Sequence, residues 1–593
     1  MVYKWFRRFE YLVEWTKDKL SPKQFLLFSS VLVGLSVGIS AIILKYFAHS
    51  IYLLSTYKGF ESFKVIFLFF PLIGILLTVF IVKRFFKDKL DRGLALIHYS
   101  LAKKSSTLSR EHMFAHIVTS SVTVGMGGSA GLEAPIVVTG AAFGSNYSRK
   151  YRMSYQERTL LLACGISSGI AAVFNAPIAG VLFALEVLLI DISISAFTPL
   201  ILAAATGALV SMIFIEESVL LRIENHLPFN YHNTLFYVLL GVLAGLISVY
   251  HARAFMGIEH FIKHKYSGKY SKVLFSGIGL AVLIAFFPSL FGEGYQSIKY
   301  LSLEQPDKVM AGSFLTSYFS NEWLLLFGIG FVIFLKAVAT SLTIGGGGNG
   351  GNFAPSLFVG SYLGYFVSRL INMLNISSLP VSNFTLVGMA GILSGLYHAP
   401  LTAIFLIAEI TGGYSLMIPL MIVSSISFAI SKYFEPLPMD TKKLGKRGVA
   451  LTYDRDHNIL TSIQTSHLIE TNFQCIDPEQ KLESIIEVFS KSQRNIFPVV
   501  DKKMHLKGVI ILDNIRDIMF KSELYDKLQA KELMTLPKAV VSSNESMEDI
   551  MTKFDETGAW NLPVIDNGCY IGFISKSSVF ASYRSKLKET TIH

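Results

Sequence analysis

One carboxylate and two glycine-rich turns are the residues of this chain best suited to do chemistry. Glu133 stands in the segment Gly131-Leu132-Glu133-Ala134-Pro135, and the same G-x-x-A-P pattern returns 220 residues later as Gly351-Asn352-Phe353-Ala354-Pro355. Proline is favoured in the first turn of a helix, so each segment predicts a helix start. Free amides at a helix start attract an anion, and the helix dipole adds to this. Two such starts aimed at one point predict an anion site that needs no fixed cation.

Glu133 is itself an anion on a tether, and it predicts a gate. When ionised, it could occupy the site and exclude a permeant anion; when protonated, it should leave. Such a gate responds to pH and to anion concentration. The alternative is a carboxylate that caps its own helix, a role that is compatible with gating. Capping alone does not explain the second copy of the pattern, which lacks the carboxylate.

Two further carboxylates lie at matching places downstream of the two turns. Glu186 and Glu409 each stand nine residues after the proline of an Ala-Pro pair, in otherwise apolar runs. An ionisable group inside a membrane is costly unless it is paired. Glu186 could therefore form a proton path together with Glu133. The symmetric placement of Glu186 and Glu409 favours structural hydrogen bonding over a relay.

The composition places these motifs in a lipid bilayer. Of the 593 residues, 52% are hydrophobic and 16% are charged, and the mean hydropathy is +0.49. Soluble proteins usually have about 25% charged residues. Uncharged runs such as Phe25–Leu44 and Ile410–Ser431 reach the ~18–20 residues that span a bilayer. The net charge of +11 is explained by cytoplasmic lysines and arginines more simply than by nucleic-acid binding.

Other function classes lack their motifs in this sequence. The three cysteines, Cys164, Cys475 and Cys569, are too few for a disulfide scaffold or a four-cysteine zinc site. The sequence has no Walker-type phosphate loop, no cluster of zinc ligands and no G-x-S-x-G turn. We therefore predict that the protein is not an enzyme, binds no metal and needs no resident cofactor.

Two internal repeats predict the domain organisation. In the membrane domain, residues 1–440, the segment Gly165–Gly169 recurs as Gly391–Gly395, and paired interrupted segments of this kind are typical of transporters. A linker at 441–464 leads to a charged tail, in which Phe497–Asp501 recurs as Leu562–Asp566 with an offset of 65. The tail is predicted to hold two small α/β modules, 465–524 and 530–593, each with an amphipathic helix and two strands, the second strand at Gly508–Leu512 or Gly572–Ser575.

The charges at the chain start predict the orientation. Lys4, Arg7 and Arg8 favour a cytoplasmic N-terminus by the positive-inside rule. The charged tail is expected on the same side. Because no cleavable signal pattern is present, we expect an integral protein of a plasma or inner membrane.

The motifs together resemble the CLC family of chloride channels and chloride/proton antiporters. The resemblance rests on GLEAP, on Gly169–Glu186, on Gly350–Pro355 and on the junction Asp440–Gly448, and the tail resembles a pair of CBS domains. It implies an α-helical polytopic membrane domain with inverted repeats and broken helices, followed by a cytoplasmic α/β CBS pair. It also implies a homodimer with one pore per subunit. The anion ligands would be the backbone amides of Gly131, Leu132, Gly351, Asn352 and Phe353.

Four positions depart from the family pattern. Arg92 stands where the family has a serine that coordinates the central anion, and Asp440 where it has a pore tyrosine. Asn352 replaces the isoleucine that usually precedes Phe353. Val187 follows Glu186 where many antiporters have a second glutamate. The permeant anion, chloride or a relative of it, and the choice between a channel and a coupled antiporter therefore stay open.

The tail raises a question of regulation. CBS pairs can bind an adenine nucleotide, often through a Ser or Thr with an Asp three residues later. The first module offers Asn514 and the second offers Ser575 and Ser578, and neither matches fully. Nucleotide binding is thus a weaker expectation than a structural or gating role. An alternative of another class is a non-conducting nucleotide sensor on a membrane anchor. The intact Glu133 and the two G-x-x-A-P turns argue against this alternative.

Overall fold

A computed structural model describes residues 2–56, 67–88, 90–103, 106–188, 194–214, 228–316, 318–445, 460 and 463–590. The chain divides into two compact units, a helical unit up to Leu451 and a second unit over Thr452–Thr591. Most of the predicted linker, and with it the end of the junction motif, lies outside the described residues. Each unit is treated by itself below.

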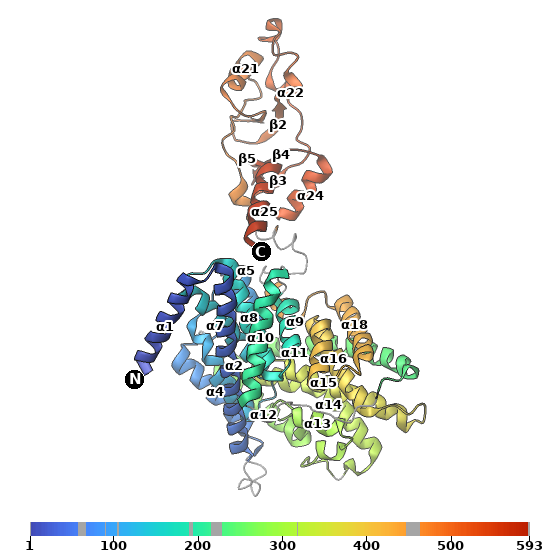
Figure 1. Cartoon of the computed structure of the whole chain (residues 1–593). Helices are drawn as coiled ribbons and strands as arrows, with labels where there is room; N and C mark the ends of the chain where they lie inside the picture. Colours follow the sequence, from blue (N-terminus) through green and yellow to red (C-terminus); the bar gives the residue numbers. More distant parts are fainter. Residues whose placement is uncertain are drawn as a thin grey trace. The chain divides into compact units, whose positions relative to one another are not determined.

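The first unit is built from helices, which are shown in Figure 1. The first half of the unit contains α1 (Val2–Lys19), α2 (Pro22–Ser55), α4 (Phe70–Phe86), α5 (Ala95–Lys103), α6 (Ala115–Gly125), α7 (Glu133–Lys150), α8 (Tyr155–Phe174), α9 (Pro177–Leu188) and α10 (Ile194–Phe214). The second half contains α11 (Thr234–Lys265), α12 (Lys269–Phe286), α13 (Tyr295–Ser302), α14 (Glu322–Gly345), α15 (Phe353–Met373), α16 (Val381–Tyr397), α17 (Pro400–Ile410), α18 (Met417–Phe434) and α19 (Met439–Gly445). Short 3-10 turns, among them η4 (Pro288–Leu290) and η5 (Pro306–Val309), join some of these helices.

The helices confirm a membrane domain. In the described part of the chain, seven helices are long and apolar enough to cross a bilayer. Other helices, such as α9 and α17, are shorter and apolar, as expected for the predicted broken segments. Many side chains that face outward are large and apolar, for example Ile43 and Phe331, which suits contact with lipid tails.

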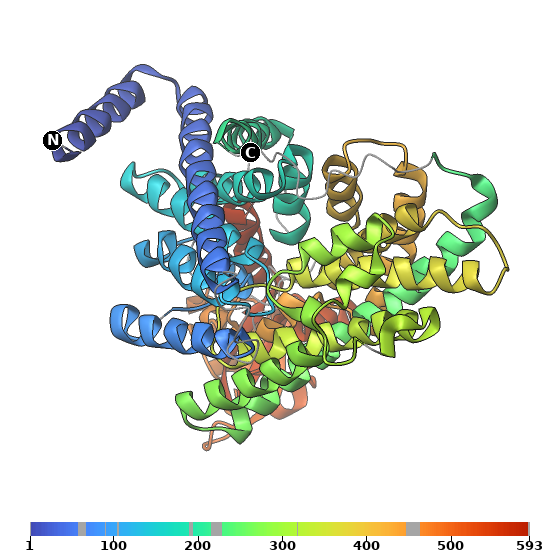
Figure 2. The same cartoon turned by 90° about the horizontal axis from the view of Figure 1, so that it is seen from below.

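The two halves repeat the same arrangement, with α7, α8 and α9 matched by α15, α16 and α17. In both views α7–α10 lie on one side and α15–α18 on the other (Figures 1 and 2). Helix α7 packs on α8 and α15 packs on α16, while α9 contacts α17 across the two halves. The predicted inverted-repeat fold is thereby confirmed.

Glycines allow the closest of these helix contacts. A methyl group at Gly140 of α7 would lie 2.2 Å from the carbonyl oxygen of Gly165 in α8. The mirrored pair, Gly360 of α15 and Gly388 of α16, is equally close, at 2.3 Å. Small residues let membrane helices approach to backbone contact. These glycines therefore determine the distance of α7 from α8 and of α15 from α16, and α7 and α15 begin at the two turns.

The second unit contains two small α/β modules. In the first module, α21 (Leu482–Lys491) accompanies the antiparallel strands β1 (Ile496–Val500) and β2 (Leu506–Ile511). In the second, α24 (Met547–Thr557) accompanies a sheet in the order β3 (Val541–Ser542), β4 (Asn561–Asp566) and β5 (Cys569–Ser575). The remaining helices are α22 (Leu512–Ile515), α23 (Ala530–Leu533) and α25 (Lys576–Thr590).

The repeat in the tail has a simple physical basis. Ile485 and Phe489 of α21 pack with Phe497 in one core, and Ile550 and Phe554 of α24 pack at the matching place of the other. The same apolar spacing thus buries the same helix face in both copies. The second strands begin at Leu506 and Cys569, a few residues earlier than the sequence predicts, because the antiparallel ladder extends back toward the tight turn.

Candidate functional site

The two glycine-rich turns meet directly. The amide of Gly131 donates a hydrogen bond to the carbonyl of Gly351, and the amide of Gly351 donates to the carbonyl of Gly131, each over 2.9 Å. A methyl group at Gly131 would lie 2.0 Å from Oε2 of Glu133, and one at Gly351 would lie 2.5 Å from Cβ of Ala134. A side chain at Gly131 would displace the Glu133 carboxylate, and one at Gly351 would clash with Ala134. The two helix starts are brought to one place as predicted.

Glu133 is the first residue of α7, and its carboxylate reaches the other repeat. The side chain is buried, with 1% of its surface exposed. Its Oε2 accepts a hydrogen bond of 3.4 Å from the amide of Ala354, in the first turn of α15. Its Oε1 accepts one of 2.5 Å from the hydroxyl of Tyr295. The carboxylate thus lies at the helix start where an anion is expected.

A second carboxylate, which the sequence analysis missed, covers the other helix start. The amide of Leu132 donates a hydrogen bond of 3.2 Å to Oε1 of Glu293. Glu293 is half-buried, in contrast to Glu133. It belongs to the turn Gly292-Glu293-Gly294 that leads into α13 and to Tyr295. An acidic residue between two glycines, after an apolar helix, is the sequence signal that could have indicated it.

Two lysines complete this cluster. Lys45 of α2 donates a hydrogen bond to the carbonyl of Val173 and lies within electrostatic range of both Glu133 and Glu293. Lys336 of α14 is fully buried; its Nζ donates to the carbonyls of Gly292 and Glu293 over 3.2 and 3.4 Å. Because buried charges are costly unless paired, the two amines help to hold the carboxylates in the apolar interior. Each lysine stands in an apolar helix, which is a signal in the sequence.

Arg92 lies at the end of α14, beside the second turn. Its Nη1 donates hydrogen bonds to the carbonyls of Gly347 and Gly348 over 2.7 and 2.8 Å. Next to it, the Asn349 side chain contacts Nδ1 of His116 over 3.1 Å and donates to Oγ1 of Thr119 over 2.6 Å. Arg92 therefore contacts the loop that leads into α15.

Two of the other departures, Asn352 and Asp440, have partners in neighbouring helices. Oδ1 of Asn352 contacts Nε2 of His251 over 3.3 Å, so this side chain turns toward α11. Asp440 stands in α19 and is within electrostatic range of Tyr397. The Tyr397 ring packs on Phe353 with 5.7 Å between ring centres. Tyr397 is a phenol beside the second turn that the sequence analysis did not single out.

Glu186 and Glu409 cap each other's helices. Glu186 of α9 accepts hydrogen bonds from the amides of Leu401 and Thr402 at the start of α17, over 3.0 and 2.7 Å. Glu409 of α17 accepts bonds from the amides of Ile178 and Ala179 at the start of α9, over 3.0 and 2.8 Å. This reciprocal arrangement gives both carboxylates a structural task. The proton path through Glu186 stays a prediction.

We expect Glu409→Gln to lower the thermal stability of the purified protein. A carboxamide cannot accept hydrogen bonds from two amides with both of its polar atoms, so the change costs on the order of 1–2 kcal/mol. Glu186→Gln should cost a similar amount. Melting in detergent, followed by size-exclusion chromatography, measures both. The control is Glu322→Gln, whose side chain is 72% exposed; a wild-type melting temperature for Glu409→Gln would contradict the capping role.

The same pair of variants tests the proton path. Glu186→Gln and Glu409→Gln change symmetric positions, although Glu186 also accepts a hydrogen bond of 2.6 Å from the hydroxyl of Thr402. Loss of proton coupling in the Glu186 variant alone would assign that residue to the path.

The residues predicted for a nucleotide have other partners. The Ser575 hydroxyl donates to Oε1 of Glu470 over 2.7 Å, and the amide of Ser578 donates to the Ser575 hydroxyl over 3.1 Å. Asn514 is an exposed residue of α22. Nucleotide binding by these residues stays a prediction.

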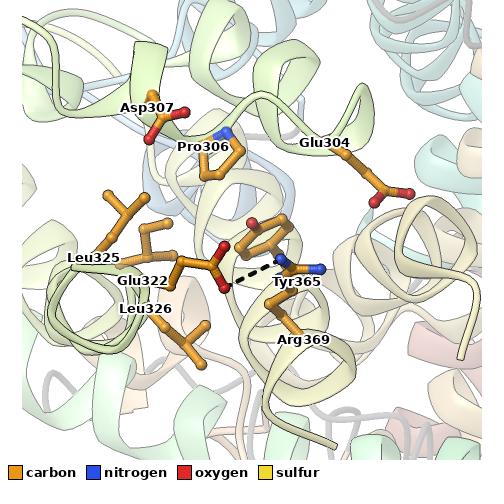
Figure 3. A pocket seen from close by; sticks show the side chains of 9 residues that line it. Glu304, Pro306, Asp307, Glu322, Leu325, Leu326, Tyr365 and Arg369 are labelled. Carbon is orange, nitrogen blue, oxygen red and sulfur yellow. Dashed lines mark ion pairs between the residues drawn. The ribbon is translucent and has the colours of Figure 1, made fainter. Parts of the chain in front are cut away.

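A surface pocket lies apart from the residues predicted for the anion site. It is lined by residues of the segment between α13 and α14, of α14 and of α15: Glu304, Pro306, Asp307, Glu322, Leu325, Leu326, Ile329, Tyr365 and Arg369. Figure 3 shows the ion pair across it, from Arg369 to Glu322, with an N–O distance of 3.6 Å. None of the predicted anion ligands lines this pocket.

Comparisons with known proteins show the family of the membrane domain and of the tail. Residues 73–432 match the family described as voltage gated chloride channel, and residues 466–521 and 530–584 each match the CBS domain. The chain is 30% identical over 347 residues to chloride channel protein CLC-e of Arabidopsis thaliana, covering 55% of this chain and 46% of that protein. It is 28% identical over 319 residues to the voltage-gated ClC-type chloride channel ClcB of Escherichia coli, covering 53% of this chain and 71% of that protein.

Solved structures share the fold. A slow cyanobacterial Cl⁻/H⁺ antiporter superposes with a TM-score of 0.62 at 20% identity, over 72% of this chain and 98% of that one. A CLC-type fluoride/proton antiporter does so with a TM-score of 0.57 at 23% identity, over 70% and 98%. The matched part of this chain spans about half the length of the plant relative. The family match covers most of the described membrane unit, and the chain therefore belongs to the CLC family of voltage-gated chloride channels and carries two CBS domains.

Proposed function

We propose that this chain carries chloride or a similar small anion across a membrane, through one pore in each subunit of a homodimer, and that Glu133 is the gate. The observation that carries the proposal is the position of the Glu133 carboxylate on the amide of Ala354. An anion that binds the start of α15 must compete with this carboxylate for the same donor. Protonation removes the negative charge of Glu133 and with it the competition.

The ligand set suits conduction. Backbone amides and helix dipoles attract an anion through partial charges, so the anion can also leave. Among relatives, the plant protein and the E. coli protein are named chloride channels. Val187, in place of the second glutamate of many antiporters, favours a passive channel.

Coupled anion/proton exchange is the second candidate, and the acidic cluster favours it. Glu133 is buried, whereas the neighbouring Glu293 is half-buried, so Glu293 offers a second carboxylate that could bind a proton near the gate. Two solved structures of this fold are named Cl⁻/H⁺ and fluoride/proton antiporters. Both candidates use Glu133, and they differ in whether protons move with the anion.

We expect purified protein in proteoliposomes to release chloride down an imposed gradient. Internal pH is recorded at the same time, and a potassium ionophore clamps the membrane potential. Chloride release without proton movement would establish the channel. Proton movement uphill, driven by the chloride gradient, would establish the antiporter. Liposomes that release no chloride at acidic or neutral pH, although the protein is folded and inserted, would contradict the proposed function and support the sensor alternative.

A further inference from the structure

The turn that carries Glu293 is held rigidly against the first glycine-rich turn. Gly292 and Gly294 have φ angles of 66° and 92°, a backbone conformation that glycine adopts without strain. The amide of Gly292 donates to the carbonyl of Gly127 over 3.1 Å. Lys336 fixes the other side of the turn through its two carbonyl contacts. Glu293 is thus directed at the site by its backbone.

The two carboxylates cover the two helix starts that meet at the site. Glu293 accepts from the amide of Leu132, at the start of α7, and Glu133 accepts from the amide of Ala354, at the start of α15. Leu132 directly precedes Glu133, and Tyr295, two residues after Glu293, donates to Glu133. Each helix start is therefore covered by a tethered carboxylate, the half-buried one at α7 and the buried one at α15.

The charges around Glu293 couple it to the gate. The groups that act on it are Glu133 of α7, Lys45 of α2 and Lys336 of α14, and Tyr295 belongs to the same turn. Glu293 is repelled by the Glu133 carboxylate and attracted by the two amines. A change of charge on one carboxylate therefore alters the electrostatic energy of the other.

We propose that Glu293 is a second tethered carboxylate of the anion pathway, which must release the amide of Leu132 before an anion can reach the position held by Glu133. This inference rests on the proposed function, which it deepens by adding a second proton-binding residue. An entering anion replaces Glu293 first and Glu133 second. Opening the pathway therefore takes up two protons rather than one.

The rival role for Glu293 is that of a neutral cap on α7. A glutamine at this position keeps a carbonyl oxygen that can accept from Leu132 but has no charge to gain or lose. A cap survives Glu293→Gln, whereas a titrating carboxylate does not. This substitution separates the two roles without removing the hydrogen bond.

The test is chloride efflux from proteoliposomes at clamped potential, over roughly pH 4 to 8, the range in which carboxylates titrate. We expect the logarithm of the wild-type efflux rate to rise as pH falls, with a limiting slope of about two per pH unit. For Glu293→Gln and for Glu133→Gln, the slope should be about one. The double variant should be independent of pH. The matched control Glu322→Gln should behave as wild type.

The outcomes separate this inference from the proposed function. If wild type conducts and Glu133→Gln changes its pH dependence while Glu293→Gln matches wild type in slope and midpoint, the second carboxylate is refuted and the gate stands. If neither wild type nor any variant releases chloride, both the proposed function and this inference fail. If Glu293→Gln does not fold, Glu293→Asp replaces it: this side chain titrates but reaches less far, so the midpoint should move. An unchanged midpoint would overturn the inference.

Discussion

Glu133→Gln is expected to raise the anion flux at neutral pH, because the carboxylate at the start of α15 no longer blocks the site. The Glu133 carboxylate accepts hydrogen bonds from the amide of Ala354 and the hydroxyl of Tyr295, and in the proposed function it competes with the anion for that amide. Glutamine has a similar size but no negative charge. We expect the flux at neutral pH to rise about tenfold or more, which corresponds to the removal of at least about 1.4 kcal/mol of competition.

The measurement is chloride efflux from proteoliposomes at neutral and acidic pH, with the potential clamped. Tyr295→Phe is the matched control, because it removes the hydroxyl donor and keeps the carboxylate. Its flux should still depend on pH, with a displaced midpoint. If the protein is an antiporter, Glu133→Gln should also abolish uphill proton movement. A Glu133→Gln protein with wild-type flux and wild-type pH dependence would refute the gate.

Much of the scaffold of the site could be predicted because the chain contains it twice. The G-x-x-A-P turns, the Ala-Pro pairs and the carboxylates Glu186 and Glu409 recur in the same order. A repeated pattern can be identified from one sequence, and the structure brings Gly131 and Gly351 into direct contact. The same reasoning predicted the two tail modules, since identical apolar spacing buries the same face of α21 and α24.

The other charged residues at the site could not be predicted in the same way. Glu293, Lys45 and Lys336 come from three separate elements, and no local pattern links them to Glu133. Their contacts are long-range and depend on how α2, α13 and α14 pack. The available signal was the presence of isolated charges in apolar surroundings, which marks a functional or paired residue in a membrane protein.

The two halves use equivalent places for unlike charges. Arg92 and Glu293 each precede a glycine of positive φ, Gly93 and Gly294, at the start of a short helix. Repeats related by an axis in the membrane plane place such residues on opposite sides of the central site. The guanidinium of Arg92 and the carboxylate of Glu293 thus occupy matching places of the two halves. The fold is symmetric, while the distribution of charge is not.

The scaffold itself depends on backbone contact between helices, and Gly140→Ala should break it. The added methyl group would lie 2.2 Å from the carbonyl oxygen of Gly165, so α7 and α8 must separate. Overpacking of this kind costs about 1–3 kcal/mol, and more where backbone atoms clash. Because α7 begins at Glu133, the separation should also displace the gate. We expect a lower melting temperature in detergent and a loss of pH-dependent flux.

Gly257→Ala provides the control with the opposite sign. Gly257 lies inside α11 with no atom within 4 Å of an added methyl group. Alanine is favoured over glycine in a helix interior by about 0.5–1 kcal/mol, so this variant should melt at or above the wild-type temperature. The two changes add the same methyl group to helical glycines. Equal melting temperatures for Gly140→Ala and Gly257→Ala would show that helix propensity, and not the contact between α7 and α8, determines the stability of the two variants. The position of Glu133 would then not depend on that contact.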